Sequence, residues 1–126
     1  MNKLIKTTMI LLIVFITGCY YDTEERLYPV ISTSCDLNNV TFAATVKPIL
    51  QASCLNCHSN AKAAKEGAGI KLENYADIKP FAAEGHLMSV IKHEPGHTPM
   101  PLDGSKLSDC EINQLQKWID NGILNN

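Results

Sequence analysis

Residues 54–58 read Cys54-Leu55-Asn56-Cys57-His58, and this short stretch decides how the rest of the chain is interpreted. Two thiols three positions apart can add across the two vinyl groups on one edge of a porphyrin and form two thioether bonds. The histidine that follows then lies under the ring centre, where an imidazole nitrogen can bind iron. The pattern therefore predicts one covalently attached haem c, held by Cys54 and Cys57 and ligated by His58.

Two other kinds of site share part of this pattern. A Cys-x-x-Cys pair can be a redox dithiol, but that site belongs to a βαβ context, which the helical patterns described below do not favour. The pair can also be half of a zinc site. The other half would have to come from Cys35 and Cys110 or from histidines, because the chain has no second Cys-x-x-Cys. The haem interpretation is preferred, and the zinc site stays as an alternative.

A sixth iron ligand is expected from the C-terminal half, which offers five candidates: His86, Met88, His93, His97 and Met100. Met100 stands between two prolines, which keep the loop extended and stiff and have no N–H to donate. A loop of that kind can present a thioether to iron, so Met100 is the predicted ligand and His97 the second choice. Met88 is expected on the core side of a helix. His93 and His97 are expected to be solvated loop residues.

The residues before the motif have the periodicity of a helix. Apolar side chains recur there at helical spacing: Phe42, Val46, Ile49 and Leu50. Thr41 precedes them and is the expected N-cap. Pro48 lacks the N–H that a helix interior requires. Either the helix kinks at Pro48, or it begins near Val46 with the proline in its first turn. In both cases the helix leads into Cys54.

Loops and helices then alternate toward the C-terminus. Residues 59–69 are polar and end in Gly-Ala-Gly, so a loop is expected there. Helices are expected over residues 75–83, ended by Gly85, and over residues 87–92. Residues 93–104 hold many prolines and glycines and are expected to form a second loop.

The last helix has the clearest signals. Ser108 and Glu111 have the spacing of a capping box, in which each residue bonds the backbone of the other. An apolar stripe follows, made of Ile112, Leu115, Trp118 and Ile119. Gly122 fits the position just after a helix end. A helix over residues 109–121 is therefore predicted. Because every expected element is helix or loop, the fold class is expected to be all-α.

The first 18 residues have the pattern of an export signal. Lys3 and Lys6 precede an apolar run over residues 9–16 that is too short to span a bilayer as a mature helix. The residues Ile16-Thr17-Gly18-Cys19 resemble the lipobox of bacterial lipoproteins. This resemblance implies that Cys19 is lipidated after removal of residues 1–18, and that residues 19–34 tether a domain over residues 35–126. The alternative is an ordinary signal peptide in which Cys19 is present by chance.

The charge and the remaining cysteines narrow the function further. Removal of residues 1–18 takes away two lysines and no acidic residue, so the formal net charge changes from −2 to −4. No basic stripe remains, and nucleic acid is therefore not expected as a partner.

Cys35 and Cys110 are left over, and in an oxidising compartment they are expected to form a disulfide. The alternative is a pair of buried free thiols.

These stretches together resemble a known family, the small mono-haem cytochrome c domains of bacterial, often Bacteroidetes-type, lipoproteins. The matching stretches occur in order over residues 41–123: Pro48-Ile49-Leu50, the haem motif, Gly69-Ile70-Lys71-Leu72-x-x-Tyr75, Met100-Pro101, Lys106-Leu107-Ser108 and Ile112-x-x-Leu115-x-x-Trp118-Ile119-x-x-Gly122. Gly67-Ala68-Gly69 departs from the family, where many relatives have paired glycines. The resemblance implies a class I cytochrome c fold, whose helices and loops wrap around one covalently bound haem and whose first and last helices cross beside it. It also implies His58 as the proximal ligand and Met100 as the distal one.

The expected function is that of a membrane-anchored carrier of single electrons between redox partner proteins, whose identity the sequence does not give. With both axial positions filled, neither enzymatic chemistry nor a small-molecule substrate is expected. If Met100 is not a ligand, the open iron could act as a peroxidase or bind a gas; a zinc-binding module is the other alternative. The chain is expected to be exported and lipid-anchored. Tyr20 after Cys19 favours the outer membrane, with the haem domain facing the periplasm or the outside.

Overall fold

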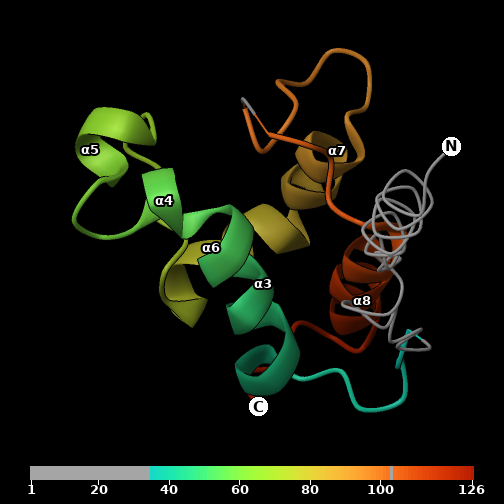
Figure 1. The fold of residues 1–126 in the computed structure, drawn as a ribbon. Helices are drawn as coiled ribbons and strands as arrows, with labels where there is room; N and C mark the ends of the chain where they lie inside the picture. Colours follow the sequence, from blue (N-terminus) through green and yellow to red (C-terminus); the bar gives the residue numbers. More distant parts are fainter. Residues whose placement is uncertain (1–34, 103) are drawn as a thin grey trace, which may run out of the picture. The chain divides into compact units, whose positions relative to one another are not determined.

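The computed structural model describes residues 35–102 and 104–126. The expectations for the signal peptide, lipidated Cys19 and the tether lie outside the described residues. Within these two ranges every regular element is a helix and no strand occurs (Figure 1). The all-α fold class is therefore confirmed. None of the helices in the described part of the chain is long and apolar enough to span a membrane.

The first helix starts with a π-helical turn. η1 (Phe42–Val46) is capped by Thr41, whose hydroxyl accepts a backbone N–H at 3.1 Å, as predicted. The N–H of Val46 donates to the carbonyl of Thr41, five residues back, at 3.1 Å. α3 (Lys47–Ser53) continues directly with Pro48 in its first turn. The wide π turn lowers the clash between the proline ring and the preceding turn, so the helix runs on without a break.

Four short helices follow. α4 (Leu55–His58) and α5 (Ala63–Glu66) are single turns, and α6 (Tyr75–Ala83) and α7 (His86–Lys92) are longer. The predicted bounds of α6 are correct, and α7 begins one residue earlier than predicted. The prediction of loop throughout residues 59–69 is wrong, because α5 lies inside it. Alanine and lysine have high helix propensity, which favours the single helical turn that forms in this stretch.

The last helix, α8 (Asp109–Asp120), begins at the predicted residue and ends one residue earlier than predicted. The Ser108 hydroxyl accepts the N–H of Glu111 at 3.3 Å, and the Glu111 carboxylate accepts the N–H of Ser108 at 2.8 Å, which completes the capping box. At the other end Gly122 has a φ of +95°, and the N–H of Ile123 donates to the carbonyl of Trp118 at 3.1 Å. This is the Schellman arrangement that the glycine predicted.

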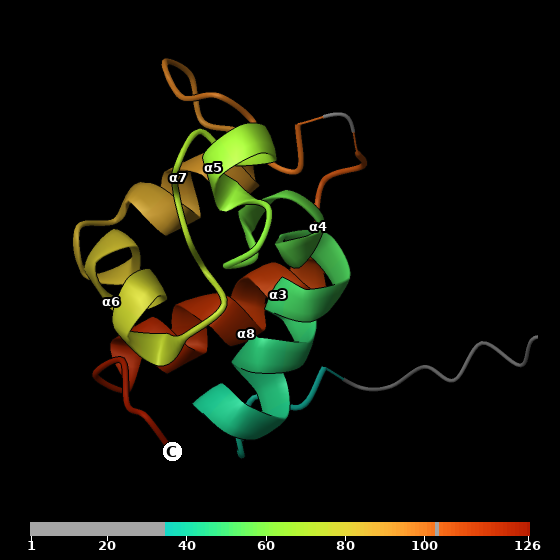
Figure 2. The same ribbon diagram turned by 90° about the vertical axis from the view of Figure 1, so that its left-hand side faces the viewer.

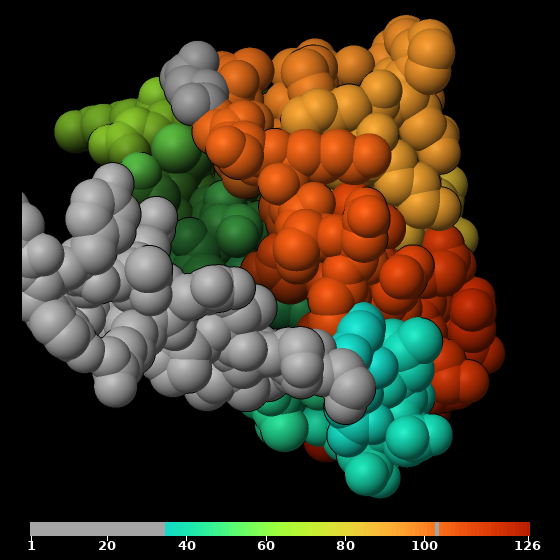
Figure 3. All heavy atoms as spheres, turned by 45° about the vertical axis from the view of Figure 1, so that its right-hand side comes forward, coloured from blue at the N-terminus to red at the C-terminus, as the bar shows by residue number. Residues whose placement is uncertain are grey.

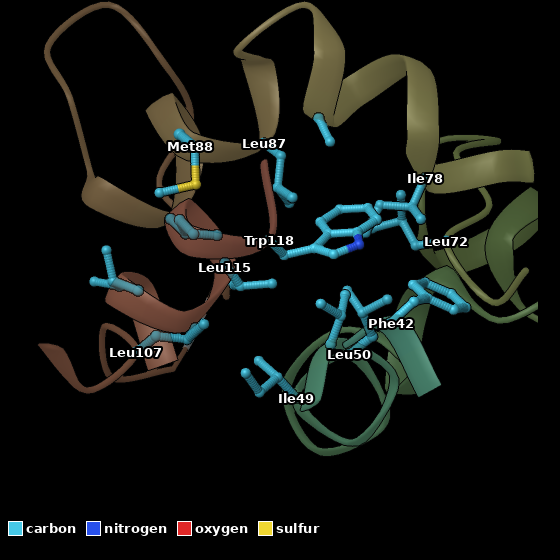
Figure 4. Packing of buried hydrophobic residues seen from close by; sticks show 14 of the residues in the cluster. Phe42, Ile49, Leu50, Leu72, Ile78, Leu87, Met88, Leu107, Leu115 and Trp118 are labelled. Atoms are coloured by element: carbon cyan, nitrogen blue, oxygen red, sulfur yellow. The ribbon is translucent and has the colours of Figure 1, made fainter. Parts of the chain in front are cut away.

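The core lies between the first and last helices. Figure 2 shows α3 in front of α8, and α8 packs against η1 and α7. Trp118 is only 1% exposed and stands at the centre of the cluster in Figure 4, with Phe42 and Leu50 on one side and Leu87 on another. The ring centroids of Trp118 and Phe42 are 5.8 Å apart. Burial of each such side chain stabilises the fold by about 1.5–3 kcal/mol, so this contact holds the helices together.

Two segments at the ends of the described chain are fastened to this core. Residues 35–41 lie against the start of α8 (Figure 3), where Cys35 and Cys110 form a disulfide with their Cα atoms 5.4 Å apart. This is the pairing that the cysteine count favoured. The tail after α8 returns to η1, and the Asn126 side-chain oxygen accepts the N–H of Phe42 at 3.0 Å. The hydroxyl of Tyr75 donates to the carbonyl of Ile123 at 2.7 Å and holds the same tail.

Candidate haem-binding site

The five motif residues form a tight helical turn directly after α3. Cys54 ends that helix, with its N–H donating to the carbonyl of Leu50 at 2.8 Å, and its backbone then departs from helical angles. α4 begins at the next residue, and the carbonyl of Cys54 accepts the N–H groups of Cys57 at 3.2 Å and His58 at 2.9 Å. Residues three apart on a helical turn lie on the same face. The two thiols, both free and partly buried, are therefore carried by one turn.

The imidazole of His58 is oriented by a single hydrogen bond. Its Nδ1 lies 2.9 Å from the carbonyl oxygen of Ile70. A carbonyl oxygen can only accept, so Nδ1 is the nitrogen that donates, and in the neutral imidazole Nε2 is then the nitrogen that has the lone pair. Metal-binding histidines are commonly held in this way, by a carbonyl on the nitrogen away from the metal. The backbone reinforces the arrangement, because the N–H of Leu72 donates to the carbonyl of His58 at 2.9 Å.

Gly67 sits against this histidine at close range. A Cβ atom placed on Gly67 would lie 2.7 Å from the carbonyl oxygen of Cys57 and 2.9 Å from Nδ1 of His58. Both separations are below van der Waals contact, so no side chain fits there. The backbone angles of Gly67 are ordinary, and the reason for a glycine is the close approach alone. The sequence here is Gly67-Ala68-Gly69 rather than a pair of adjacent glycines, and Gly67 is the glycine that lies against His58.

The environment of Cys54 suppresses its thiolate. Burial, and secondarily the negative charge of Glu111, raise the pKa of the thiol to about 11. Cys54 also packs against the buried core cluster. In catalytic redox dithiols the pKa of the reactive thiol is lowered instead, by nearby positive charge or by a helix N-terminus. The site therefore suits a cysteine that is bonded to an apolar group better than one that acts as a thiolate.

Met100 stands on a loop whose backbone is fastened to the end of α7. Its N–H donates to the carbonyl of Val90 at 3.0 Å, and its carbonyl oxygen lies 3.0 Å from Nε2 of His93. Met100 is partly buried, whereas Leu102 is 63% exposed. The loop predicted from prolines and glycines is therefore present, and its one methionine is held in a defined backbone position.

The other candidates for a sixth ligand have different surroundings. Met88 is 7% exposed and packs in the core from α7 (Figure 4), as predicted. His86 and His97 are both exposed, and their ring centroids are 5.6 Å apart. His93 is also exposed and follows the last residue of α7, as predicted for a solvated loop residue, and its ring bonds the Met100 backbone as well. No signal in the sequence pointed to that contact.

The zinc alternative lacks ligands in the described part of the chain. Cys35 and Cys110, the cysteines that could have completed a zinc site, are joined to each other. Among residues 35–102 and 104–126, no three side chains of His, Cys, Asp or Glu gather closely enough to hold a metal ion. A four-ligand structural zinc site needs such a cluster.

Comparison with known proteins does not assign the chain to a family. No family model matches the sequence, and neither a curated protein nor a solved structure matches it at a significant level. The residues of the site are therefore the basis for the function proposed below.

Proposed function

We propose that this chain is a mono-haem c-type cytochrome that carries single electrons. The observation that carries the proposal is the orientation of His58, whose Nδ1 donates to the carbonyl of Ile70, so that in the neutral imidazole Nε2 is the nitrogen available to a metal. This histidine directly follows two free thiols on one helical turn. Two cysteines and a following histidine in this spacing are the pattern of covalent haem attachment.

The residues present fit the group. Cys54 and Cys57 would hold the porphyrin through thioether bonds, and Nε2 of His58 would bind the iron. Gly67 leaves room beside the imidazole that a Cβ would fill. The haem iron would supply the one-electron redox chemistry when bound, and the chain would supply the ligands.

Met100 is proposed as the distal ligand. A thioether opposite an imidazole raises the reduction potential relative to other ligand sets, which suits an electron carrier. The two hydrogen bonds on its backbone support this role, since they limit the positions that the side chain can reach. His97 stays the second choice. We further propose a class I cytochrome c arrangement, for which the packing of η1 against α8 gives support.

The chain is also proposed to be exported, anchored to the outer membrane through lipidated Cys19, and to dock with redox partner proteins. Mass spectrometry of the mature protein from membranes tests the anchor, the haem and the disulfide together. We expect a mass that includes acyl groups at Cys19 and one covalent haem, and a Cys19→Ser variant that is found in the soluble fraction. An unacylated mature chain would refute the anchor while leaving the haem proposal intact.

The reduced absorption spectrum separates the proposed function from its rivals. A sharp low-spin haem c spectrum is expected for the carrier. A high-spin spectrum would indicate an open iron and favour a haem enzyme or gas-binding protein. A Cys54→Ser/Cys57→Ser double variant should contain no covalent haem, whereas a Cys35→Ser/Cys110→Ser variant should keep it. A purified wild-type protein without haem would refute the proposal.

The distal ligand is tested by replacing one methionine at a time. Met100→Leu keeps an apolar side chain of similar size but removes the sulfur. We expect the reduction potential to fall by on the order of 0.1 V, within the span of about 0.8 V that axial ligands set. Met88→Leu is the matched control, because Met88 is a core residue, and it should keep the wild-type potential. A Met100→Leu protein with an unchanged potential and spectrum would exclude Met100, and His97→Ala would then be measured.

A further inference from the structure

The loop that carries Met100 is joined to the end of α7 by two hydrogen bonds, one at the N–H of Met100 and one at its carbonyl. The N–H of Met100 donates to the carbonyl of Val90, and the carbonyl of Met100 accepts a hydrogen bond from Nε2 of His93, each at 3.0 Å. Because the acceptor is a carbonyl oxygen, the proton of His93 must be on Nε2. Both polar groups of the Met100 backbone are therefore engaged by residues at the C-terminal end of the same helix.

His93 makes this bond from an unusual backbone conformation. It follows the last residue of α7 with φ +59° and ψ +44°, in the left-handed region. Helices often end in this conformation, but the residue there is usually glycine, or sometimes asparagine, since other side chains crowd the backbone. A histidine at a glycine position is strained, and strained residues are often retained for what the side chain does. The side chain of His93 bonds one backbone group, the carbonyl of Met100.

A fixed backbone at Met100 restricts where its thioether can go. With both the N–H and the carbonyl bonded, rotation about the backbone of this residue is restricted, so less conformational entropy is lost when the side chain binds a metal. Metal ligands are commonly held by neighbouring hydrogen bonds in this manner. The bond from His93 acts on the carbonyl that directly precedes Pro101, on the exposed side of the loop.

We propose that His93 is a positioning residue that holds the Met100 loop so that the thioether is presented to the haem iron. This inference rests on the proposed function, and it adds a residue that acts on the distal ligand through the backbone. His93 itself is not assigned as an iron ligand, because its Nε2 is already bonded to the Met100 carbonyl.

Two substitutions separate a positioning role from a merely structural one. His93→Gly removes the hydrogen bond but relieves the left-handed backbone, so the midpoint of thermal unfolding should stay the same or rise. His93→Gln keeps an amide donor close to the place of Nε2. If His93 served only the fold, the glycine variant would be indistinguishable from wild type in every haem property.

The measurements are made on the wild-type holoprotein and both variants. In His93→Gly we expect the affinity of ferric haem for added imidazole, which competes with Met100, to rise about fivefold, since one hydrogen bond holding the loop is lost. Amide hydrogen exchange at Met100 should accelerate about fivefold for the same reason. The far-red absorption band that marks methionine bound to ferric iron should weaken. His93→Gln should recover most of the wild-type behaviour in all three.

Each outcome bears on one proposal or on both. Wild-type imidazole affinity and Met100 exchange in His93→Gly would overturn the positioning role and leave the electron-carrier proposal standing. A wild-type holoprotein that lacks the methionine band would overturn the distal assignment of Met100, and the role of His93 with it. Weakening in His93→Gly without recovery in His93→Gln would also count against the hydrogen bond as the cause.

Discussion

At His58 one hydrogen bond determines which ring nitrogen is available to a metal. The carbonyl of Ile70 accepts the proton of Nδ1, and the lone pair of Nε2 is left free. The motif alone names the histidine but cannot choose between its two nitrogens. The partner comes from a residue 12 positions later in the chain, so the choice depends on how the segment over residues 59–72, which includes α5, folds back.

Gly67→Ala tests whether the close approach to His58 matters. The added Cβ would overlap the Cys57 carbonyl and His58 Nδ1, and such overpacking costs about 1–3 kcal/mol. We expect a lower midpoint of thermal unfolding and a haem spectrum shifted toward high spin, because the imidazole is displaced.

Gly69→Ala is the matched control for Gly67→Ala. Gly69 has a φ of +79°, and a Cβ atom at this position would meet no other atom within 4 Å, so alanine there strains only the backbone. It should lower stability by roughly 1–2 kcal/mol while the haem spectrum stays that of wild type. Equal haem spectra for both variants would show that the close approach of Gly67 to His58 does not affect how the imidazole binds iron.

The buried thiol of Cys54 predicts a pH dependence for the haem-free chain. Its pKa is about 9 in the unfolded chain and about 11 in the folded one, so the folded state holds the proton more tightly. This contribution to stability is complete below pH 9 and is lost as the pH rises from about 9 to 11. We expect a loss of about 2 kcal/mol, after allowance for partial exposure, in urea unfolding followed across that range.

Two controls isolate the thiol in that experiment. A haem-free Cys54→Ala variant should lack this component of the alkaline loss, because it has no proton to release at this position. The holoprotein should lack it too, since a thioether does not titrate. An equal alkaline loss in the haem-free chain and its Cys54→Ala variant would assign the effect to other groups.

At the scale of elements, end signals and apolar spacing predicted most of the helices. The capping box at Ser108 and Glu111, the stripe through Trp118 and the glycine after α8 each act within a few residues, and all three are present in the structure. α5 was missed because a single turn of helix has too few residues to show a periodicity. The sequence left two possibilities at Pro48, a kink or a place in the first turn of a helix, and the structure has Pro48 in the first turn of α3, directly after the π turn η1. No local pattern predicts a π turn.

Ser108→Ala tests the contribution of the capping box to α8. The hydroxyl accepts the N–H of Glu111, and loss of such a cap costs about 1 kcal/mol. We expect the midpoint of thermal unfolding to fall by roughly 4–8 °C. Ser105→Ala, an exposed loop serine three residues earlier, should change it by less than a third of that. Equal effects of the two substitutions would mean that the cap is not used in solution.

At the scale of the whole molecule, the disulfide and the returning tail join segments that are far apart in sequence. Cys35 and Cys110 are 75 positions apart, and their bond fastens the first described residues to the start of α8. The Asn126 side chain fastens the tail to η1 in a similar way. Both contacts close the structure around the packing of η1 against α8.

Reduction of the disulfide is expected to lower stability substantially. A loop of this length contributes about 4 kcal/mol on the chain-entropy model, which corresponds to a fall of roughly 15 °C or more in the unfolding midpoint. The holoprotein suits the measurement, because a thiol reductant cleaves the disulfide and leaves thioethers intact. A Cys35→Ala/Cys110→Ala variant should not respond to the reductant. A wild-type midpoint that the reductant leaves unchanged would contradict the prediction.

The sequence by itself determined the all-α class, the bounds of the longer helices and the residues that bear the chemistry at Cys54, Cys57 and His58. These depend on interactions within a few residues, so they can be read along the chain. Only the tertiary structure decided the free nitrogen of His58, the need for Gly67 beside it and the bond from His93 to the Met100 carbonyl. In each case a side chain meets a backbone group brought close by folding, and contacts of that kind leave no periodic pattern in the residues that make them.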